Sequence, residues 1–109
     1  MNALKNKVQL IGHLGQNPEI KTFDGGKKLA KFNMATNDSY QNQKGEKVDE
    51  TQWHTITAWG KTADVIEKYL SKGSEVMIEG RLTHREYTDA NGIKKYFTEV
   101  QLNELLLLD

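Results

Sequence analysis

Apolar and polar residues alternate along most of this chain, and a period of two residues is typical of half-buried β-strands. Only one stretch changes period: between residues 63 and 70 the apolar residues recur every three or four positions, which predicts a helix. Thr62 is the expected N-cap of this helix, and Lys72-Gly73 is expected to mark its end. Strands are expected at residues 8–14, 19–23, 29–37, 51–59, 75–88 and 93–108.

Two short polar segments contain the residues that tight turns require. Asp24-Gly25-Gly26 and Asp89-Ala90-Asn91-Gly92 each separate two predicted strands, so both are expected to form hairpin turns. Residues 39–50 are polar over a longer distance and contain one aromatic residue, Tyr40. We expect this segment to form a long, mobile hairpin tip.

The order of the main elements is three strands, one helix and two strands, in a chain of 109 residues that suffices for one compact domain. This order is typical of the OB fold, an all-β barrel of five strands with one helix between strands 3 and 4. Closure of the barrel would also remove exposed sheet edges. We therefore predict a single OB-fold domain over residues 1–109, with a plain antiparallel sandwich as the alternative.

The strand predicted at residues 51–59 contains both tryptophans of the chain. Trp53 and Trp59 have the same parity, with threonines between them, while Ile56 and Ala58 lie on the opposite side. At ~3.3 Å per residue the two rings are about 20 Å apart, which suits a platform for the stacked bases of a single strand. The alternative is that the rings fill the core, and this strand by itself favours neither interpretation.

Other aromatic residues favour the binding interpretation. Tyr87 ends the polar side of a strand that also carries Arg81 and Arg85, and Tyr40 lies near a hairpin tip that contains lysines. Rings interleaved with cations suit single strands of any sequence, because every base has a π-face and the cations neutralise phosphates. Taken singly, Tyr87 is also explained as an amphipathic strand residue and Tyr40 as a loop anchor.

The remaining aromatic residues are divided by the same alternation. Phe23, Phe32 and Tyr69 are expected in the core, together with Tyr96. Phe97 has the opposite parity to the apolar residues that follow it, so we leave it unassigned.

Composition limits the possible classes of protein. Basic and acidic residues number 15 each, so the net charge is zero, with a balance of +4 over residues 1–48 and −4 over residues 49–109. A basic groove is therefore compatible with the composition but not demonstrated by it. Because there is no cysteine, no apolar run of membrane length and no secretory leader pattern, we expect a soluble cytoplasmic protein without disulfides.

Catalytic chemistry has little support in the sequence. His13, His54 and His84 lie on separate predicted strands without metal-ligand spacing, and no serine lies in a nucleophile-elbow context. The segment Gly12 to Gly15 has the spacing of an RNA-clamping loop, but strands flank it, so we interpret it as a bend. We predict no enzyme activity, no cofactor and no metal site.

Six segments of the chain form a set of motifs in a fixed order. They are Val8-Gln9-Leu10-Ile11-Gly12-His13-Leu14-Gly15-Gln16-Asn17-Pro18-Glu19, Ala35-Thr36-Asn37-Asp38-Ser39-Tyr40, Thr51-Gln52-Trp53-His54, Trp59-Gly60-Lys61, Tyr69-Leu70-Ser71-Lys72-Gly73-Ser74 and Ile78-Glu79-Gly80-Arg81-Leu82. They resemble the bacterial single-stranded DNA-binding protein family, SSB, and the resemblance runs in order from about Asn6 to Leu102, which is nearly the whole chain. The resemblance implies an OB fold, usually a homotetramer, that wraps single-stranded DNA in replication, recombination and repair.

The resemblance also implies roles for individual residues. The rings expected to stack on DNA are Tyr40, Trp53, Trp59 and Tyr87, with tyrosine at 40 and 87 where the best-known members have tryptophan and Trp59 where they have phenylalanine. The cations expected to meet DNA are Lys7, Lys61, Lys72 and Arg85, to which the polar strand side adds Arg81. Subunit contacts are expected at His54 and along the first strand, at Val8 and Leu10.

SSB proteins usually end in a glycine- and proline-rich tail with an acidic terminus that recruits partner enzymes. This sequence stops at Asp109 without such a tail, so the recruitment of replication and repair proteins is left open. We predict a cytoplasmic, nucleoid-associated protein that binds single-stranded DNA with little sequence preference. The alternatives are a tail-less primosomal, replication-restart relative, usually dimeric, and an OB module whose aromatic side meets another protein.

Overall fold

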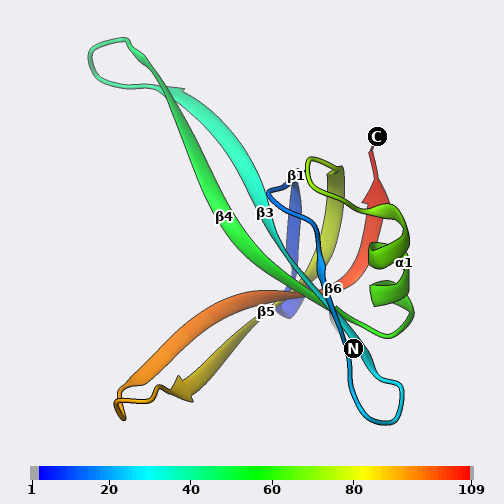
Figure 1. The fold of residues 1–109 in the computed structure, drawn as a ribbon. Helices are drawn as coiled ribbons and strands as arrows, with labels where there is room; N and C mark the ends of the chain where they lie inside the picture. Colours follow the sequence, from blue (N-terminus) through cyan, green and yellow to red (C-terminus); the bar gives the residue numbers. More distant parts are fainter. Residues whose placement is uncertain (1–2, 109) are drawn as a thin grey trace.

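The computed structural model describes residues 3–108, which form one six-stranded sheet and one α-helix (Figure 1). In chain order its elements are the 3₁₀ turn η1 (Ala3–Lys5), β1 (Val8–Leu14), β2 (Glu19–Thr22), β3 (Lys28–Gln41), β4 (Lys47–Trp59), α1 (Lys61–Tyr69), β5 (Glu75–Thr88) and β6 (Lys94–Leu107).

The sheet closes on itself to form a barrel. Its strand order is β1-β5-β6-β4-β3-β2, and β1 also pairs with β3, at His13↔Ala35 and Leu14↔Met34. The barrel therefore consists of β1, β3, β4, β5 and β6, and α1 lies between the third and fourth of these strands along the chain. This arrangement confirms the predicted OB fold with its helix between strands 3 and 4, and it excludes the plain sandwich.

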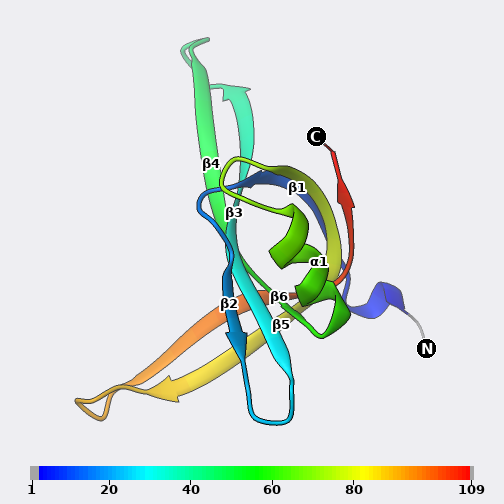
Figure 2. The same cartoon turned by 45° about the vertical axis from the view of Figure 1, so that its right-hand side comes forward.

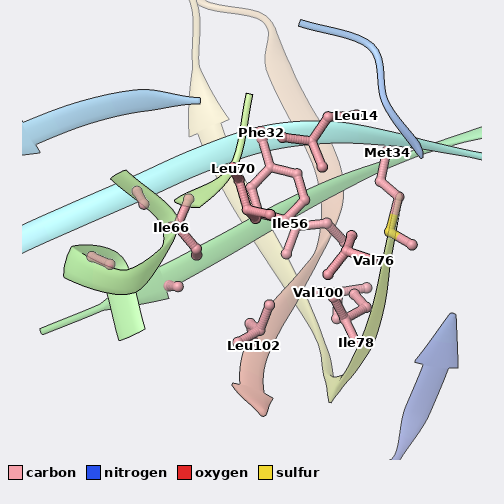
Figure 3. Close-up of a cluster of buried hydrophobic side chains, with 13 residues drawn as sticks. Leu14, Phe32, Met34, Ile56, Ile66, Leu70, Val76, Ile78, Val100 and Leu102 are labelled. Atoms are coloured by element: carbon pink, nitrogen blue, oxygen red, sulfur yellow. The ribbon is translucent and has the colours of Figure 1, made fainter. Parts of the chain in front are cut away.

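The barrel interior is filled by alternate residues of its strands. Phe32 and Met34 of β3 and Ile56 of β4 are at most 1% exposed. Ile66 and Leu70, from α1 and the residue that follows it, belong to the same apolar cluster and close one end of the barrel (Figure 3). Full burial of each such side chain contributes roughly 1.5–3 kcal/mol, so the helix is held mainly by its inner side.

Two hairpins extend as long ribbons beyond the barrel (Figure 1). In the first, β3 and β4 stay paired out to Gln41↔Lys47, so the predicted hairpin is present but most of residues 39–50 are paired strand rather than a long loop. Only residues 42–46 form the turn, in which the Asn42 side-chain oxygen accepts two backbone N–H bonds, at 2.9 and 3.0 Å. Polar residues suit an exposed two-stranded ribbon as well as a loop, and composition alone does not separate the two.

The start of α1 differs from the expected position. Gly60 is the N-cap, with a φ of 66°, and no side chain hydrogen bonds to the cap, so the assignment of Thr62 was wrong. The Gly60 N–H donates to the Lys28 carbonyl at 3.0 Å, and the Gly60 carbonyl accepts from the Asp64 N–H at 3.1 Å. Because glycine adopts positive φ readily, the chain can leave β4 and enter the helix within one residue (Figure 2).

Lys28 connects the start of β3 to α1. Its Nζ lies 2.8 Å from an Asp64 oxygen and 2.9 Å from a Glu67 oxygen. The hydrogen bonds to Asp64 and Glu67 raise the pKa of Lys28 to about 12. This lysine is therefore directed toward the helix, and its neighbour Leu29 pairs with Trp59 on the other side of the sheet.

Three rings assigned to the core by their pattern lie at the surface instead. Tyr69, Tyr96 and Phe23 are 56%, 71% and 37% exposed, whereas Phe32 is buried as predicted. Tyr69 lies at the end of α1 and outside the apolar cluster that its neighbour Leu70 joins. Tyr96 lies on the β5–β6 ribbon, where neither side of the two strands is covered by a second layer (Figure 1).

Candidate nucleic-acid interface

One side of the sheet forms a continuous surface across five strands. Directly opposed residues of paired strands point to the same side, so the register can be followed from β2 to β5. We call this surface the strand face. Its residues are Glu19 and Lys21 of β2, Leu29, Lys31, Asn33 and Ala35 of β3, Trp53, Thr55, Thr57 and Trp59 of β4, Lys95, Phe97, Glu99 and Gln101 of β6, and Arg81, Thr83, Arg85 and Tyr87 of β5.

Both tryptophans lie on the strand face and are accessible. Trp53 is 61% exposed and Trp59 is 38% exposed, whereas Ile56 and Ala58 on the other side of β4 are fully buried. The interpretation that the rings fill the core is therefore excluded. The division of β4 into an apolar inner side and an aromatic outer side follows the alternation of the sequence.

The Trp53 ring lies against the loop that follows β1. A Cβ atom at Gly15 would be 2.5 Å from Trp53 Cζ3, so glycine is the residue that leaves room for the ring. At Gly12 an added Cβ would collide with the Ala35 carbonyl, where β1 meets β3 to close the barrel. Both glycines permit close packing, which agrees with a bend in the chain rather than an RNA-clamping loop.

The two arginines of β5 contact polar residues of β6 on the strand face. Arg85 Nε donates to Glu99 Oε1 at 2.6 Å, and Arg81 Nη2 donates to Gln101 Oε1 at 2.9 Å. Glu99 is only 4% exposed, but the Arg85 side chain is 57% exposed. Arg85 therefore neutralises a buried acid in the middle of the face while the rest of its guanidinium remains available for other acceptors.

The Arg85→Ala variant is expected to lose about 1–3 kcal/mol of unfolding free energy, because the buried Glu99 carboxylate loses a charge-assisted hydrogen bond. Arg81→Ala is the matched control, since the partner of Arg81 is a neutral amide and an exposed change of this kind costs within about 0.5 kcal/mol. Urea denaturation of both variants measures the difference. Equal losses in the two variants would show that Glu99 does not depend on Arg85.

Two pairs of rings lie on the same side as the tryptophans. Phe23, just after β2, has its ring centroid 5.7 Å from that of Trp59, and Phe97 meets the edge of Tyr87 at 5.9 Å. All four rings are between 37% and 50% exposed. Phe97 thus belongs to the strand face. The predicted hairpin turn at residues 89–92 fixes the register of the two strands that it joins, so the pairing of Phe97 with Arg85 could have been derived from the sequence.

Tyr40 is separated from the other predicted stacking rings. It is 52% exposed and pairs with Val48, in unbroken register with the rest of the β3–β4 ladder. Trp53 pairs with Ala35, so these two residues lie on the same side of the ribbon. Ala35 and Tyr40 are an odd number of positions apart on β3, so Tyr40 lies on the other side of the ribbon from Trp53. The structure therefore brings Trp53, Trp59 and Tyr87 onto one surface but does not bring Tyr40 with them.

The three predicted lysine contacts have different surroundings. Lys7 Nζ lies 2.8 Å from Glu79 Oε1, and the hydrogen bond with this carboxylate raises the pKa of Lys7. Lys61 is exposed at the first position of α1, two residues after Trp59. Lys72 is exposed in the turn after α1, and its backbone N–H donates to Asn17 in the loop beside Trp53, at 2.8 Å. Lys61 lines a hollow formed by α1 and residues 103–107 of β6, and Lys72 lies near the loop beside Trp53. Lys7 already has an acidic partner.

The residues expected at subunit contacts lie on β1 and at the base of the β3–β4 ribbon. Val8 and Leu10 are partly buried against the barrel core, so a contact with another chain through β1 would use its backbone edge. Within the described residues β1 pairs with β3 only at His13 and Leu14, which leaves most of that edge without a strand partner. His54 Nε2 lies 2.9 Å from Thr36 Oγ1, and its role in subunit contact stays a prediction.

The three histidines do not converge on a site. His13 lies 3.6 Å from Glu75, while His54 and His84 each contact a threonine hydroxyl. Among residues 3–108 no group of three or more His, Asp or Glu side chains could hold a metal ion. In the same part of the chain no helix has the length and apolar character needed to cross a membrane.

The chain is similar in sequence and in fold to known proteins over nearly its whole length. Single-stranded DNA-binding protein 1 of Chlorobaculum tepidum is 43% identical over 104 residues, which are 94% of this chain and 64% of the relative. A solved structure titled Plasmodium falciparum SSB complex with ssDNA superposes with a TM-score of 0.89 at 37% identity, over 95% of both chains.

A second solved structure extends the comparison. A deletion mutant of the single-stranded DNA-binding protein from Thermus aquaticus has a TM-score of 0.84 and 28% identity, over 95% of this chain and 50% of that one. The present chain thus spans 64% of the Chlorobaculum relative and half of the solved Thermus deletion mutant. The profile of the single-strand binding protein family matches residues 5–108, and the chain therefore belongs to the single-strand binding protein family.

Proposed function

We propose that this protein binds single-stranded DNA with little sequence preference and without catalysing a reaction. The observation that carries the proposal is the exposure of Trp53 and Trp59 on one surface with Arg81 and Arg85. A single strand can stack its bases on the rings, because each base has a π-face, while its phosphates meet the cations. The likeness to the solved structure of the Plasmodium falciparum SSB complex with ssDNA supports this function.

Within this proposal, Trp53, Trp59 and Tyr87 stack bases along the strand face. Tyr40, on the other side of the β3–β4 ribbon, contacts DNA that passes around the edge of that ribbon. Lys7 contributes only where a phosphate replaces Glu79 as its partner. The other proposed phosphate contacts are Lys61, Lys72, Arg81 and Arg85.

We further infer that the protein sequesters and protects single strands during DNA replication, recombination and repair, which assigns it to the cytoplasm. The proposed assembly is a homotetramer, with the dimer of replication-restart relatives as the alternative. Light scattering distinguishes four chains of 12.4 kDa from two. The open backbone edge of β1 supports a contact between chains.

Titration with a 35-residue oligo-dT at low salt is expected to quench the tryptophan fluorescence, since Trp53 and Trp59 would stack on bases. The logarithm of the binding constant should fall with the logarithm of salt at about −0.7 per phosphate contacted, or about −2.8 for four contacts. A duplex of equal length is the control. Absence of quenching would contradict DNA binding and favour an OB module that meets another protein, and a flat salt response would contradict the lysine and arginine roles.

A further inference from the structure

The contact between Phe23 and Trp59 lies at the end of the strand face nearest to the β2–β3 hairpin. Their ring centroids are 5.7 Å apart and the ring planes are inclined by 31°. The two side chains are 37% and 38% exposed, so both present ring surface to solvent. The aromatic surface of β4 therefore continues past Trp59 onto the hairpin.

Phe23 is held by the turn that it begins. Its N–H donates to the Lys27 carbonyl at 2.7 Å, and its carbonyl accepts from the Gly26 N–H at 3.1 Å. Both backbone polar groups of Phe23 are thus engaged at the base of a closed hairpin turn. A ring on a fixed backbone loses less conformational entropy when a ligand binds than a ring on a free loop.

One lysine lies against the Phe23 ring. Lys21 Nζ lies 5.0 Å from the centroid of the Phe23 ring, within the range of a cation–π contact. On the other side of the hairpin turn, Lys27, Lys28 and Trp59 line a hollow of about 500 Å³ that neither Phe23 nor Lys21 lines. Residues 19–31 contain four lysines and two acidic residues, and of these lysines Lys28 is directed to α1. The site combines a ring surface with positive charge, which suits a nucleotide of a single strand.

We propose that Phe23 is a DNA-stacking residue and that, with Trp59 and Lys21, it forms a subsite for one nucleotide on the β2–β3 hairpin. The proposal rests on the proposed function and extends the path of the DNA beyond Trp59. At 5.7 Å the two rings are in direct contact, so the base stacks on the outer surface of the pair rather than between the rings. Lys21 then lies close enough to neutralise the adjoining phosphate.

The test compares the affinity of Phe23 variants for a labelled 35-residue oligo-dT by fluorescence anisotropy. Phe23→Ala is expected to bind about tenfold more weakly, which corresponds to about 1.4 kcal/mol and lies within the range for one stacked base. Phe23→Tyr should retain the wild-type affinity because it keeps a ring. Phe23→Leu keeps apolar packing against Trp59 without a π-face, so wild-type affinity in this variant would overturn the stacking role.

Tyr69 provides a matched control. It is 56% exposed and has Lys68 Nζ 5.3 Å from its ring centroid, but it lies on α1 rather than on the strand face. Tyr69→Ala should therefore bind oligo-dT as the wild-type protein does. Thermal melting of each variant verifies that its fold is intact.

Photo-cross-linking tests direct contact in the unmodified protein. Irradiation of the complex with an oligomer containing 5-iodouracil, followed by mass spectrometry, should attach a nucleotide to Phe23 as well as to Trp59. Cross-links at Trp53 and Trp59 without one at Phe23, or wild-type affinity of Phe23→Ala, would overturn the subsite and leave DNA binding standing. If the wild-type protein itself did not bind oligo-dT, both the subsite and the proposed function would be overturned.

Discussion

The double variant Trp53→Ala/Trp59→Ala is expected to lose about 2–6 kcal/mol of binding free energy for oligo-dT, since each lost base stack costs about 1–3 kcal/mol. The two rings lie on one side of β4, and neither belongs to the apolar cluster of the barrel. Because the variant contains no tryptophan, binding is measured by anisotropy of a labelled oligomer rather than by quenching.

The single variants separate the two contributions. Trp53→Ala should weaken binding while leaving the melting temperature nearly unchanged, because the ring is 61% exposed. Trp59→Ala also removes a contact with Phe23, so its loss includes any effect on the Phe23 ring in addition to one base stack. Unfolding of Trp53→Ala would contradict the interpretation of this ring as a platform, and unchanged affinity of the double variant would remove the basis of the proposed function.

The Phe32→Ala variant is expected to lose about 3–5 kcal/mol of unfolding free energy. Phe32 is 1% exposed in the centre of the apolar cluster, where it pairs with Ile56 across β3 and β4 (Figure 3). Its removal would leave a cavity between the barrel and α1 that neighbouring side chains fill only in part. The midpoint of urea denaturation measures the loss.

Phe97→Ala is the control for this change. It removes the same side chain from an exposed ribbon position, where the ring is 37% exposed and contacts Tyr87 at its edge. The expected loss is about 0.5–1.5 kcal/mol, the range for an aromatic pair beyond its buried area. A loss as large as that of Phe32→Ala would contradict the distinction between core and strand face.

Alternation divided each strand into two sides. It placed Ile56 and Ala58 opposite Trp53 and Trp59, and the structure decided that the former pair is buried and the latter exposed. The order of strands and helix likewise predicted the OB barrel. Both features depend only on the order of residues and elements along the chain, which is a property of the sequence.

Alternation was insufficient where the sheet leaves the barrel. Tyr96 and Phe23 were assigned to the core, but one lies on a ribbon without a covering layer and the other at a hairpin beside Trp59. The paired ribbon at residues 39–50 was likewise interpreted as a loop. How far a strand pair continues beyond the core depends on the dimensions of the closed barrel, and no local pattern records those dimensions.

The sequence by itself determined which residues of each strand share a side and what chemistry those residues bring. Only the tertiary structure decided which sides join into one surface, because that depends on register between strands distant in the chain. Pairing of β4 with β6, and of β6 with β5, places Arg81, Arg85 and Tyr87 beside the two tryptophans. The unbroken register of β3 with β4 places Tyr40 on the other side of the ribbon from Trp53, since successive side chains of a strand point to opposite sides.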